Sequence, residues 1–349
     1  MPSPYQGLES RAFWKSAISK LSPLELNAVY SPKFSISKKT NICAAGSCFA
    51  QHIGRQFKRR GYTFLDVEKP IHLMEPEFYQ DFGYDMYSAR YGNIYSVRQL
   101  LQLFKRATGE FKPLDSVWEK DGRYYDPFRP TIEPKGFASQ KELLLDRDYH
   151  LGQVNKLLAS AQLFVFTFGL TEAWINTEDG AVLPTCPGTV AGKYNPEKYH
   201  FHNFTHAEVL ADTIEFIARA RSQNQNMKFL FTVSPVPLTA TASGDHVLPA
   251  TVYSKSVLRG VCGELVNELD FVDYFPSYEL VSSHPMRAMF YNPNLRSVAD
   301  KGVAHVMNVF FDALGDTTID VAPKKDTSQP KKDADRISCE EILLEAFGE

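Results

Sequence analysis

Apolar residues gather along the chain into four short, nearly uninterrupted runs that segments with helical periodicity separate. The runs are Ile42–Ala45, Leu163–Phe168, Phe229–Val233 and Phe271–Phe275. Strands buried on both faces read this way, whereas half-exposed strands alternate apolar and polar residues. The pattern therefore predicts a three-layer α/β fold, with helices on both faces of a mainly parallel sheet.

Two of the intervening helices carry start signals. Thr205 and Glu208 have the spacing of a capping box, and an apolar helical face follows them. Ser297 and Asp300 have the same spacing, with Asp in place of the usual Glu. Because a capping box satisfies backbone N–H groups at a helix start, we expect a helix to begin at each point.

Two long stretches lack a clear helical or strand pattern. Tyr62–Ser139 is rich in Tyr, Phe and Pro, and an irregular stretch, Asn176–Phe204, follows the second apolar run. Loops of this length are either functional walls and lids or covers for exposed sheet and helix surface. Both interpretations remain open at the level of sequence.

The chain divides by composition into three parts. Residues 1–315 have the makings of one α/β domain, and residues 316–337 are polar, charged and Pro-containing, as in a flexible linker. Residues 338–349 predict a short C-terminal helix whose apolar side is too small to fold alone. We expect this helix either to dock back on the domain or to engage a partner.

Charge and cysteine usage narrow the function classes. A formal net charge of −3 provides no basic field, so nucleic acid is not an expected partner. The longest apolar run, Leu163–Leu170, is too short to span a membrane, and the first residues lack the pattern of a signal peptide. Five unpatterned cysteines suit reduced thiols, and the absence of CxxC and HExxH spacings predicts no metal and no cofactor. We expect a cytoplasmic protein.

The segment Asn41–Gly61 has the pattern of a buried strand, a sharp turn and a helix. Gly46 permits the turn, and Ser47 and Cys48 fall at the first turn of the helix. Unpaired backbone N–H groups and the positive end of the helix dipole favour an anionic nucleophile or an oxyanion there. The segment is therefore a candidate nucleophile elbow, with a plain strand–turn–helix crossover as the alternative.

Polar loops follow each of the four predicted strands. They are Gly46-Ser47-Cys48, Gly169–Glu172, Ser234-Pro235 and Pro276–Arg296. The carboxyl ends of parallel strands lie at one edge of the sheet, where open α/β folds bind their ligands. Their convergence predicts a site at that edge.

Residues Gly46–Ala50 spell GSCFA, and the chain resembles the bacterial branch of the GSCFA domain family over roughly residues 30–315. That family is grouped by resemblance with the SGNH (GDSL-type) esterases and acyltransferases. The resemblance implies a flavodoxin-like SGNH hydrolase fold with long loop insertions. Further segments carry it: Tyr91–Phe104, Val165–Trp174, Pro184–Thr189, Phe231–Leu238, Tyr253–Arg259 and Tyr274–Leu280.

The resemblance assigns expected roles to the elbow. An ungapped overlay of the SGNH motif Gly-Asp-Ser-Leu on Gly46–Phe49 makes Cys48 the nucleophile, and a shift by one residue makes it Ser47. We favour Cys48, because a thiol at a helix start is the better nucleophile. A buried, unreactive cysteine is the alternative.

The second and third SGNH blocks supply oxyanion donors. Gly92 is the best match for the second block, and Asn93 either adds a donor or caps the following helix. The third block reads Gly169-Leu170-Thr171, without the usual asparagine. Glu172 then either orients a base or binds substrate, or it is a first-turn carboxylate at a helix start.

The last SGNH block, Asp-x-x-His, is missing, because Asn294 and Ser297 stand in its place. The base must then come from another loop, and His284 and His246 follow the fourth and third predicted strands. A solvated surface histidine is the alternative for both. His305 and His150 fall within helical stretches, and we expect both to be packed rather than catalytic.

We therefore expect an O-acyl esterase or O-acyltransferase that acts on a carbohydrate-type hydroxyl, with a small-molecule or glycan substrate. Trp174, Tyr194 and Tyr199 could stack on a sugar ring. A non-catalytic binding module that retains the fold is the main alternative, favoured by the missing last block. A nucleotide-binding protein is the weakest, since neither GxGxxG nor GxxxxGK[ST] occurs.

Overall fold

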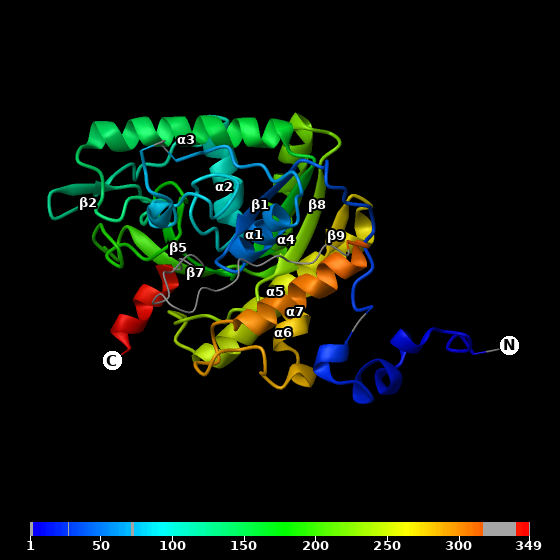
Figure 1. The fold of residues 1–349 in the computed structure, drawn as a ribbon. Coiled ribbons are helices and arrows are strands. Elements are labelled where there is room, and N and C mark those ends of the chain that lie inside the picture. The colour runs from blue at the N-terminus through cyan, green and yellow to red at the C-terminus, as the bar shows by residue number, and fades with distance from the viewer. Residues whose placement is uncertain (1–2, 27, 71–72, 317–339, 349) are drawn as a thin grey trace, which may run out of the picture.

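A computed structural model of the chain describes residues 3–26, 28–70, 73–316 and 340–348. Its central sheet has the order β1-β4-β8-β9, and every neighbouring pair is parallel (Figure 1). Each predicted apolar run is confirmed as a strand of this sheet. The strands are β1 (Ile42–Gly46), β4 (Leu163–Phe168), β8 (Lys228–Val233) and β9 (Val272–Tyr274).

A short extended segment lies on the other side of β1. Ile42 forms a parallel bridge with Phe64, donates to the Thr63 carbonyl at 2.9 Å and accepts from the Leu65 N–H at 2.8 Å. With this segment the order becomes 63–65, β1, β4, β8, β9, which is the flavodoxin-like order 2-1-3-4-5. The order reverses between β1 and β4, so the expected ligand crevice lies beyond the ends of those two strands.

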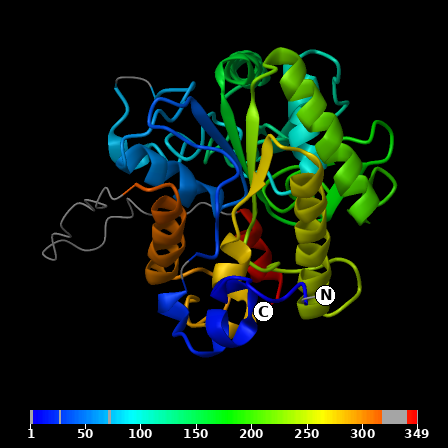
Figure 2. The same ribbon diagram turned by 90° about the vertical axis from the view of Figure 1, so that its right-hand side faces the viewer.

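Alternate side chains of the strands enter two separate cores. Cys43 and Ala45 belong to a core formed with four helices, whereas Ile42 and Ala44 belong to a core on the opposite face. Figure 2 shows the sheet between these two helical layers. The three-layer prediction is therefore confirmed. The first face carries α2 (Val97–Ala107), α3 (Gln140–Ser160), α4 (His206–Gln223) and α5 (Val247–Glu268), and the second carries α1 (Ala50–Arg59) and α7 (Asp300–Ala313).

The two long stretches contain regular structure. The interpretation of Asn176–Phe204 as irregular is wrong, because β7 (Tyr199–Asn203) pairs antiparallel with β5 (Glu172–Asn176) and β6 (Val182–Leu183) pairs with its other edge. The earlier stretch contains α2 and a hairpin. The remaining elements are β2 (Trp118–Lys120), β3 (Arg123–Tyr125), α6 (Ser277–Ser282) and the short helical segments Ser10–Ala12, Lys15–Ser19, Pro23–Glu25, Pro76–Phe78, His284–Met286 and Glu340–Phe347.

One of the two helix starts is confirmed and the other is wrong. Thr205 caps α4 and forms the complete capping box with Glu208. Helix α7 begins instead after Ala299, because the Ser297 hydroxyl donates to Asn294 Oδ1 at 3.1 Å and takes part in a local turn. Residues 317–337 of the predicted linker and Ser338 fall outside the described residues. Within the described ranges, no helix is both long and apolar enough to cross a membrane.

Candidate functional site

The predicted strand–elbow–helix segment is present, and Gly46 makes its turn. Gly46 has a φ of +146°, and a Cβ at this position would lie 2.6 Å from the Thr167 carbonyl oxygen on β4. Only glycine fits so close to the neighbouring strand. The Ala50 N–H then donates to the Ser47 carbonyl at 2.9 Å, which starts α1 directly after the elbow, Gly46-Ser47-Cys48.

Ser47 faces the loop that follows β4. Its side chain is buried, and its Oγ has no hydrogen-bond partner. A Cβ on Gly169 would lie 3.2 Å from the Cβ of Ser47 and 2.8 Å from the Tyr95 carbonyl oxygen. That carbonyl accepts from the N–H groups of Gly169 and Leu170 at 3.2 and 3.0 Å. The hydrogen bond from the Gly169 N–H therefore holds the loop after β4 in place. Because Gly169 has no side chain, there is room for Ser47 beside it.

Lys255 is the charged residue that sequence reasoning missed. It lies on α5 with 2% of its surface exposed, and its Nζ donates to the Gly169 carbonyl at 2.6 Å. Together with Ser47, Cys48 and Ser234 it lines a cavity of about 10 Å³, the elbow cavity, which has room for about one water molecule. Lys255 shares the helix face of buried Leu258 and Cys262, so a lysine at apolar helical spacing was the available signal.

Asn93 is buried and connects the second block to α1. The Tyr87 hydroxyl donates to its Oδ1, and Gln51 Nε2 donates to the same hydroxyl at 3.2 Å. The alternative role of Asn93 as a helix cap is wrong, because Ser96 caps α2. Gly92, its neighbour, has a φ of +69°, in the left-handed region that favours glycine.

Thr171, at the position where the SGNH resemblance led us to expect asparagine, lies between β4 of the central sheet and β5 of the second sheet, which has the order β6-β5-β7. Its Oγ1 donates to Asn203 Oδ1 at 2.6 Å, and its N–H donates to the Ser254 hydroxyl at 2.9 Å. Thr171 is fully buried in these contacts. Its hydroxyl is therefore committed to β7, and its backbone N–H to α5.

Glu172 and Trp174 lie on β5, in the wall of a larger cavity of about 500 Å³, the apolar cavity. The position of Glu172 in a strand excludes the alternative of a first-turn helix carboxylate. Its Oε1 accepts from the Thr241 hydroxyl at 2.6 Å, and burial raises the pKa of this carboxyl. Trp174 makes edge contacts with Tyr194 and Phe201, with ring centroids 5.3 and 5.9 Å apart.

The two candidate bases make other contacts. His284 is exposed and stacks on Trp14, with ring centroids 5.3 Å apart. His246 is exposed at the start of α5, where its Nδ1 accepts from the Leu248 N–H at 3.1 Å. Neither histidine is among the described residues that line the elbow cavity.

The two histidines that were expected to be packed are packed. His150 is completely buried and bonds to Glu68 at 2.7 Å, and burial lowers its pKa. His305 stacks on Phe290 with ring centroids 4.8 Å apart, and burial lowers its pKa as well.

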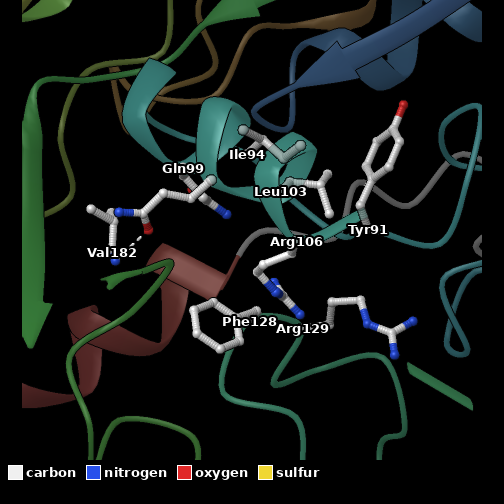
Figure 3. A pocket seen from close by; sticks show the side chains of 9 residues that line it. Tyr91, Ile94, Gln99, Leu103, Arg106, Phe128, Arg129 and Val182 are labelled. Carbon is white, nitrogen blue, oxygen red and sulfur yellow. Dashed lines mark hydrogen bonds between the residues drawn. The ribbon is translucent and has the colours of Figure 1, made fainter. Parts of the chain in front are cut away.

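A second buried polar cluster lies under α2. Arg106 lies over the Phe128 ring, 4.0 Å from its centroid, and Arg129 lies alongside (Figure 3). Burial lowers the pKa of Arg106 to about 9, and its Nη2 has no hydrogen-bond partner. The adjacent cavity of about 10 Å³ has room for about one water, which suits a structural role. Asp126 supplies the opposing charge by pairing with Arg129 and Arg147 at 3.1 and 3.0 Å.

Comparison with known proteins gives one strong result. The search of curated proteins found no match. The model of the GSCFA family matches residues 41–310, which include the elbow, Gly169, Lys255 and all four strands of the central sheet. Because the match spans most of the 349 residues, the chain belongs to the GSCFA family.

Proposed function

We propose that this protein is an acyl-transfer enzyme, an O-acyl esterase or O-acyltransferase, whose nucleophile comes from the elbow and whose base is Lys255. The observation that carries the proposal is the buried Ser47 hydroxyl, which lacks a hydrogen-bond partner and shares a cavity with Cys48 and Lys255. An unsatisfied buried hydroxyl costs about 1–3 kcal/mol, and such groups occur at functional sites.

Topology supports the same location. The elbow follows β1 and Gly169 follows β4, so both lie at the point where the strand order reverses. Open α/β sheets bind ligands outside the carboxyl ends of the strands at that point. Of the four loops that were expected to converge there, three contribute Ser47, Gly169 and Ser234 to one cavity, and Pro276–Arg296 contributes no residue to its described lining.

Lys255 is a better candidate for the base than either histidine. It is buried beside the elbow, whereas His284 and His246 are exposed and make the contacts described above. Lysines that act as general bases in proteins are buried in this way. Serine–lysine pairs also perform nucleophilic catalysis on several unrelated folds.

The reaction is a two-step transfer. The Ser47 hydroxyl, or the Cys48 thiol, attacks the acyl carbonyl carbon while its proton passes to the neutral amine of Lys255. The tetrahedral intermediate then expels the alcohol, which takes the proton back from Lys255 and leaves an acyl-enzyme. Water or an acceptor hydroxyl attacks that acyl group, gives its proton to Lys255 and releases the nucleophile, which recovers the proton.

The oxyanion donors in this proposal are the backbone N–H groups of Cys48 and Gly92, with the Asn93 amide as a third. Because the Oδ1 of Asn93 accepts from Tyr87, the Nδ2 group is the end of this amide that would act as the donor. A carbohydrate-type hydroxyl as the acyl acceptor rests on the family resemblance, and Glu172 and Trp174 are proposed to contact the substrate.

Covalent trapping tests the proposal. The full-length protein is incubated with an acyl-thioester and an aryl ester, and any adduct is located by intact and peptide mass spectrometry. Loss of a true nucleophile lowers activity by about a thousandfold or more. If Ser47 attacks, Ser47→Ala abolishes the adduct and Cys48→Ala retains it; the reverse pattern assigns Cys48. An adduct that survives both substitutions would refute the elbow as the nucleophile.

A non-catalytic binding module is the second candidate. It is favoured by the turn at the missing last block, where Asn294 Oδ1 accepts from the backbone N–H groups of Arg296 and Ser297, both at 3.1 Å. These side chains build the loop rather than a catalytic dyad. This candidate predicts ligand binding without any adduct, and with no effect of Ser47→Ala on affinity.

A further inference from the structure

The apolar cavity adjoins the elbow cavity. Tyr95, Leu170 and Leu238 line both of them, so one wall runs from the elbow into the larger space. The rest of the larger wall comes from β5, β6 and β7, from the segment after β6, from the loop after β8 and from the C-terminal helix. A ligand whose reacting atom lies at the elbow can therefore extend along this wall into the apolar cavity.

The lining is poor in charge. Trp174, Tyr194 and Phe201 provide aromatic surface, and among the described lining residues Glu172 is the one Asp, Glu, Lys or Arg. That carboxylate already accepts a hydrogen bond from Thr241. A phosphate or a sugar acid needs cations, and a neutral sugar needs many directed hydrogen bonds, so neither matches this wall.

One polar group in the wall is left open. Thr185 is 8% exposed, and its hydroxyl has no hydrogen-bond partner. It gives the cavity a place for one polar atom within an otherwise apolar ligand. The volume of about 500 Å³ lies within the range of about 300–1,000 Å³ that small-molecule sites occupy.

The C-terminal helix, Glu340–Phe347, closes part of the cavity with apolar side chains. Leu344 and Phe347 are among the lining residues, although Phe347 remains 75% exposed. Figure 1 shows this helix beside the second sheet. The chain thus places its own aliphatic and aromatic groups against the cavity, which is the chemistry that an apolar ligand would meet.

We propose that the apolar cavity binds the aliphatic chain of an acyl group and holds its carbonyl at the elbow. This inference rests on the proposed function and specifies its substrate: a medium-chain acyl ester or thioester rather than an acetyl ester. The acyl chain lies against Trp174 and Phe201, and the C-terminal helix covers the acyl chain.

Binding is tested without catalysis. Acetate, octanoate and dodecanoate are titrated into the wild-type protein by calorimetry, and into the Trp14→Phe/Trp118→Phe protein, in which Trp174 is the remaining tryptophan. Affinity should rise by about fourfold per methylene until the cavity is filled, with a shift in Trp174 emission. Equal, negligible binding of all three acids would overturn the proposal, even if an acyl adduct forms with short probes.

Turnover supplies the second arm. Cys186→Trp and Ala242→Trp place a large side chain in the cavity wall, whereas Ala304→Trp places the same side chain on the exposed face of α7. The cavity variants should lose at least tenfold in kcat/KM for an octanoyl ester and retain acetyl-ester turnover, and the α7 variant should lose neither. Equal losses for both esters, or none, would overturn the proposal.

The two experiments also distinguish a free fatty acid from an acyl thioester as the ligand. They distinguish both from occupation of the cavity by the C-terminal helix of the protein itself. Octanoate that binds without any adduct supports the cavity as an acyl site and removes the transfer reaction. If chains bind only after Leu344→Ser/Phe347→Ser, the cavity belongs to the C-terminal helix and the proposal is overturned. Comparison of octanoate with an octanoyl thioester shows which source binds more tightly, and stronger binding of either supports the proposal.

Discussion

The Nζ of Lys255 donates a 2.6 Å hydrogen bond to the carbonyl oxygen of Gly169, the glycine that lies beside Ser47. This contact holds the loop after β4 and places the buried amino group of Lys255 at the elbow cavity. The residues come from α5 and from the end of β4, 86 positions apart in the sequence. This juxtaposition exists only in the folded chain.

The first prediction concerns Lys255 as the base. Lys255→Met should lower kcat/KM for acyl transfer by about a hundredfold to ten-thousandfold, because a positioned base contributes that much. The thioether chain keeps the buried volume, so the protein should still fold. Steady-state kinetics and circular dichroism measure the two effects.

Lys301→Met is the matched control, since Lys301 is an exposed residue of α7. It should change neither rate nor fold. A pH profile separates proton transfer from positioning: the wild type should lose activity as pH falls and the base becomes protonated, and Lys255→Met should lack this limb. An unchanged profile in a folded Lys255→Met protein would contradict the assignment.

The second prediction concerns the space beside Ser47. Gly169→Ala places a Cβ 2.8 Å from the Tyr95 carbonyl oxygen and 3.2 Å from Ser47 Cβ, so the loop or the Tyr95 backbone must shift and Ser47 must give by a few tenths of an ångström. Overpacking of this kind costs about 1–3 kcal/mol in stability. The rate of adduct formation should fall by more than the loss of folded protein accounts for, because the reacting group itself is displaced.

Gly152→Ala is the contrasting variant. Gly152 is exposed within α3, and a Cβ there meets nothing within 4 Å. Alanine should raise stability by about 0.5–1 kcal/mol through helix propensity, with adduct formation unchanged. Denaturant unfolding tests both variants, and a neutral Gly169→Ala would show that the crevice is not closely packed.

The central sheet was predictable because each strand is an apolar run buried on both faces, and Thr205 marks a helix start by local chemistry. Such signals depend on neighbours in sequence. The start of α7 was misplaced because the Ser297 hydroxyl bonds to Asn294 rather than capping a helix. Strand β7 was missed because its residues, Tyr199–Asn203, are mostly polar and half-exposed, and pairing with β5 defines it.

The site was only partly predictable. The elbow could be located from glycine, the strand before it and the helix after it. The significance of Lys255 depends on Gly169 and Ser47, which are brought to it by the order of the strands. The contacts of His284 with Trp14 and of Tyr87 with Gln51 join distant parts of the chain as well, so position after a strand was insufficient to assign a role.

The third prediction concerns the buried ionic cluster around Asp126. Burial raises the pKa of this carboxyl, but Arg129, Arg147 and Arg106 more than offset it and hold the pKa well below its usual value. The carboxylate therefore stabilises the fold fully above the unfolded-state pKa of about 3.9, and this contribution is lost as pH falls toward the lower folded-state value.

Asp126→Asn leaves those guanidinium groups without their shared counter-charge and should cost about 3–5 kcal/mol. The variant should also lose part of the acid dependence of unfolding that the wild type shows below about pH 4. Urea unfolding at pH 7 and at pH 3.5 measures both effects. A variant as stable as wild type at pH 7 would refute a structural role for the cluster.

The fourth prediction concerns Cys186 in the wall of the apolar cavity. Burial raises the pKa of this thiol to about 11, so its reactive thiolate is scarce at neutral pH. Iodoacetamide labelling of Cys186, followed by peptide mass spectrometry, should rise about tenfold per pH unit from pH 7 to 10 rather than level off near 8.5. Octanoate should slow this labelling because its aliphatic chain covers the wall.

Cys43 and Cys262 provide the internal control: both are completely buried, burial raises their pKa values, and they should remain unlabelled in the folded protein. Labelling of Cys186 that levels near pH 8.5 would show a solvated thiol, and labelling at an unchanged rate in octanoate would place the acyl chain elsewhere.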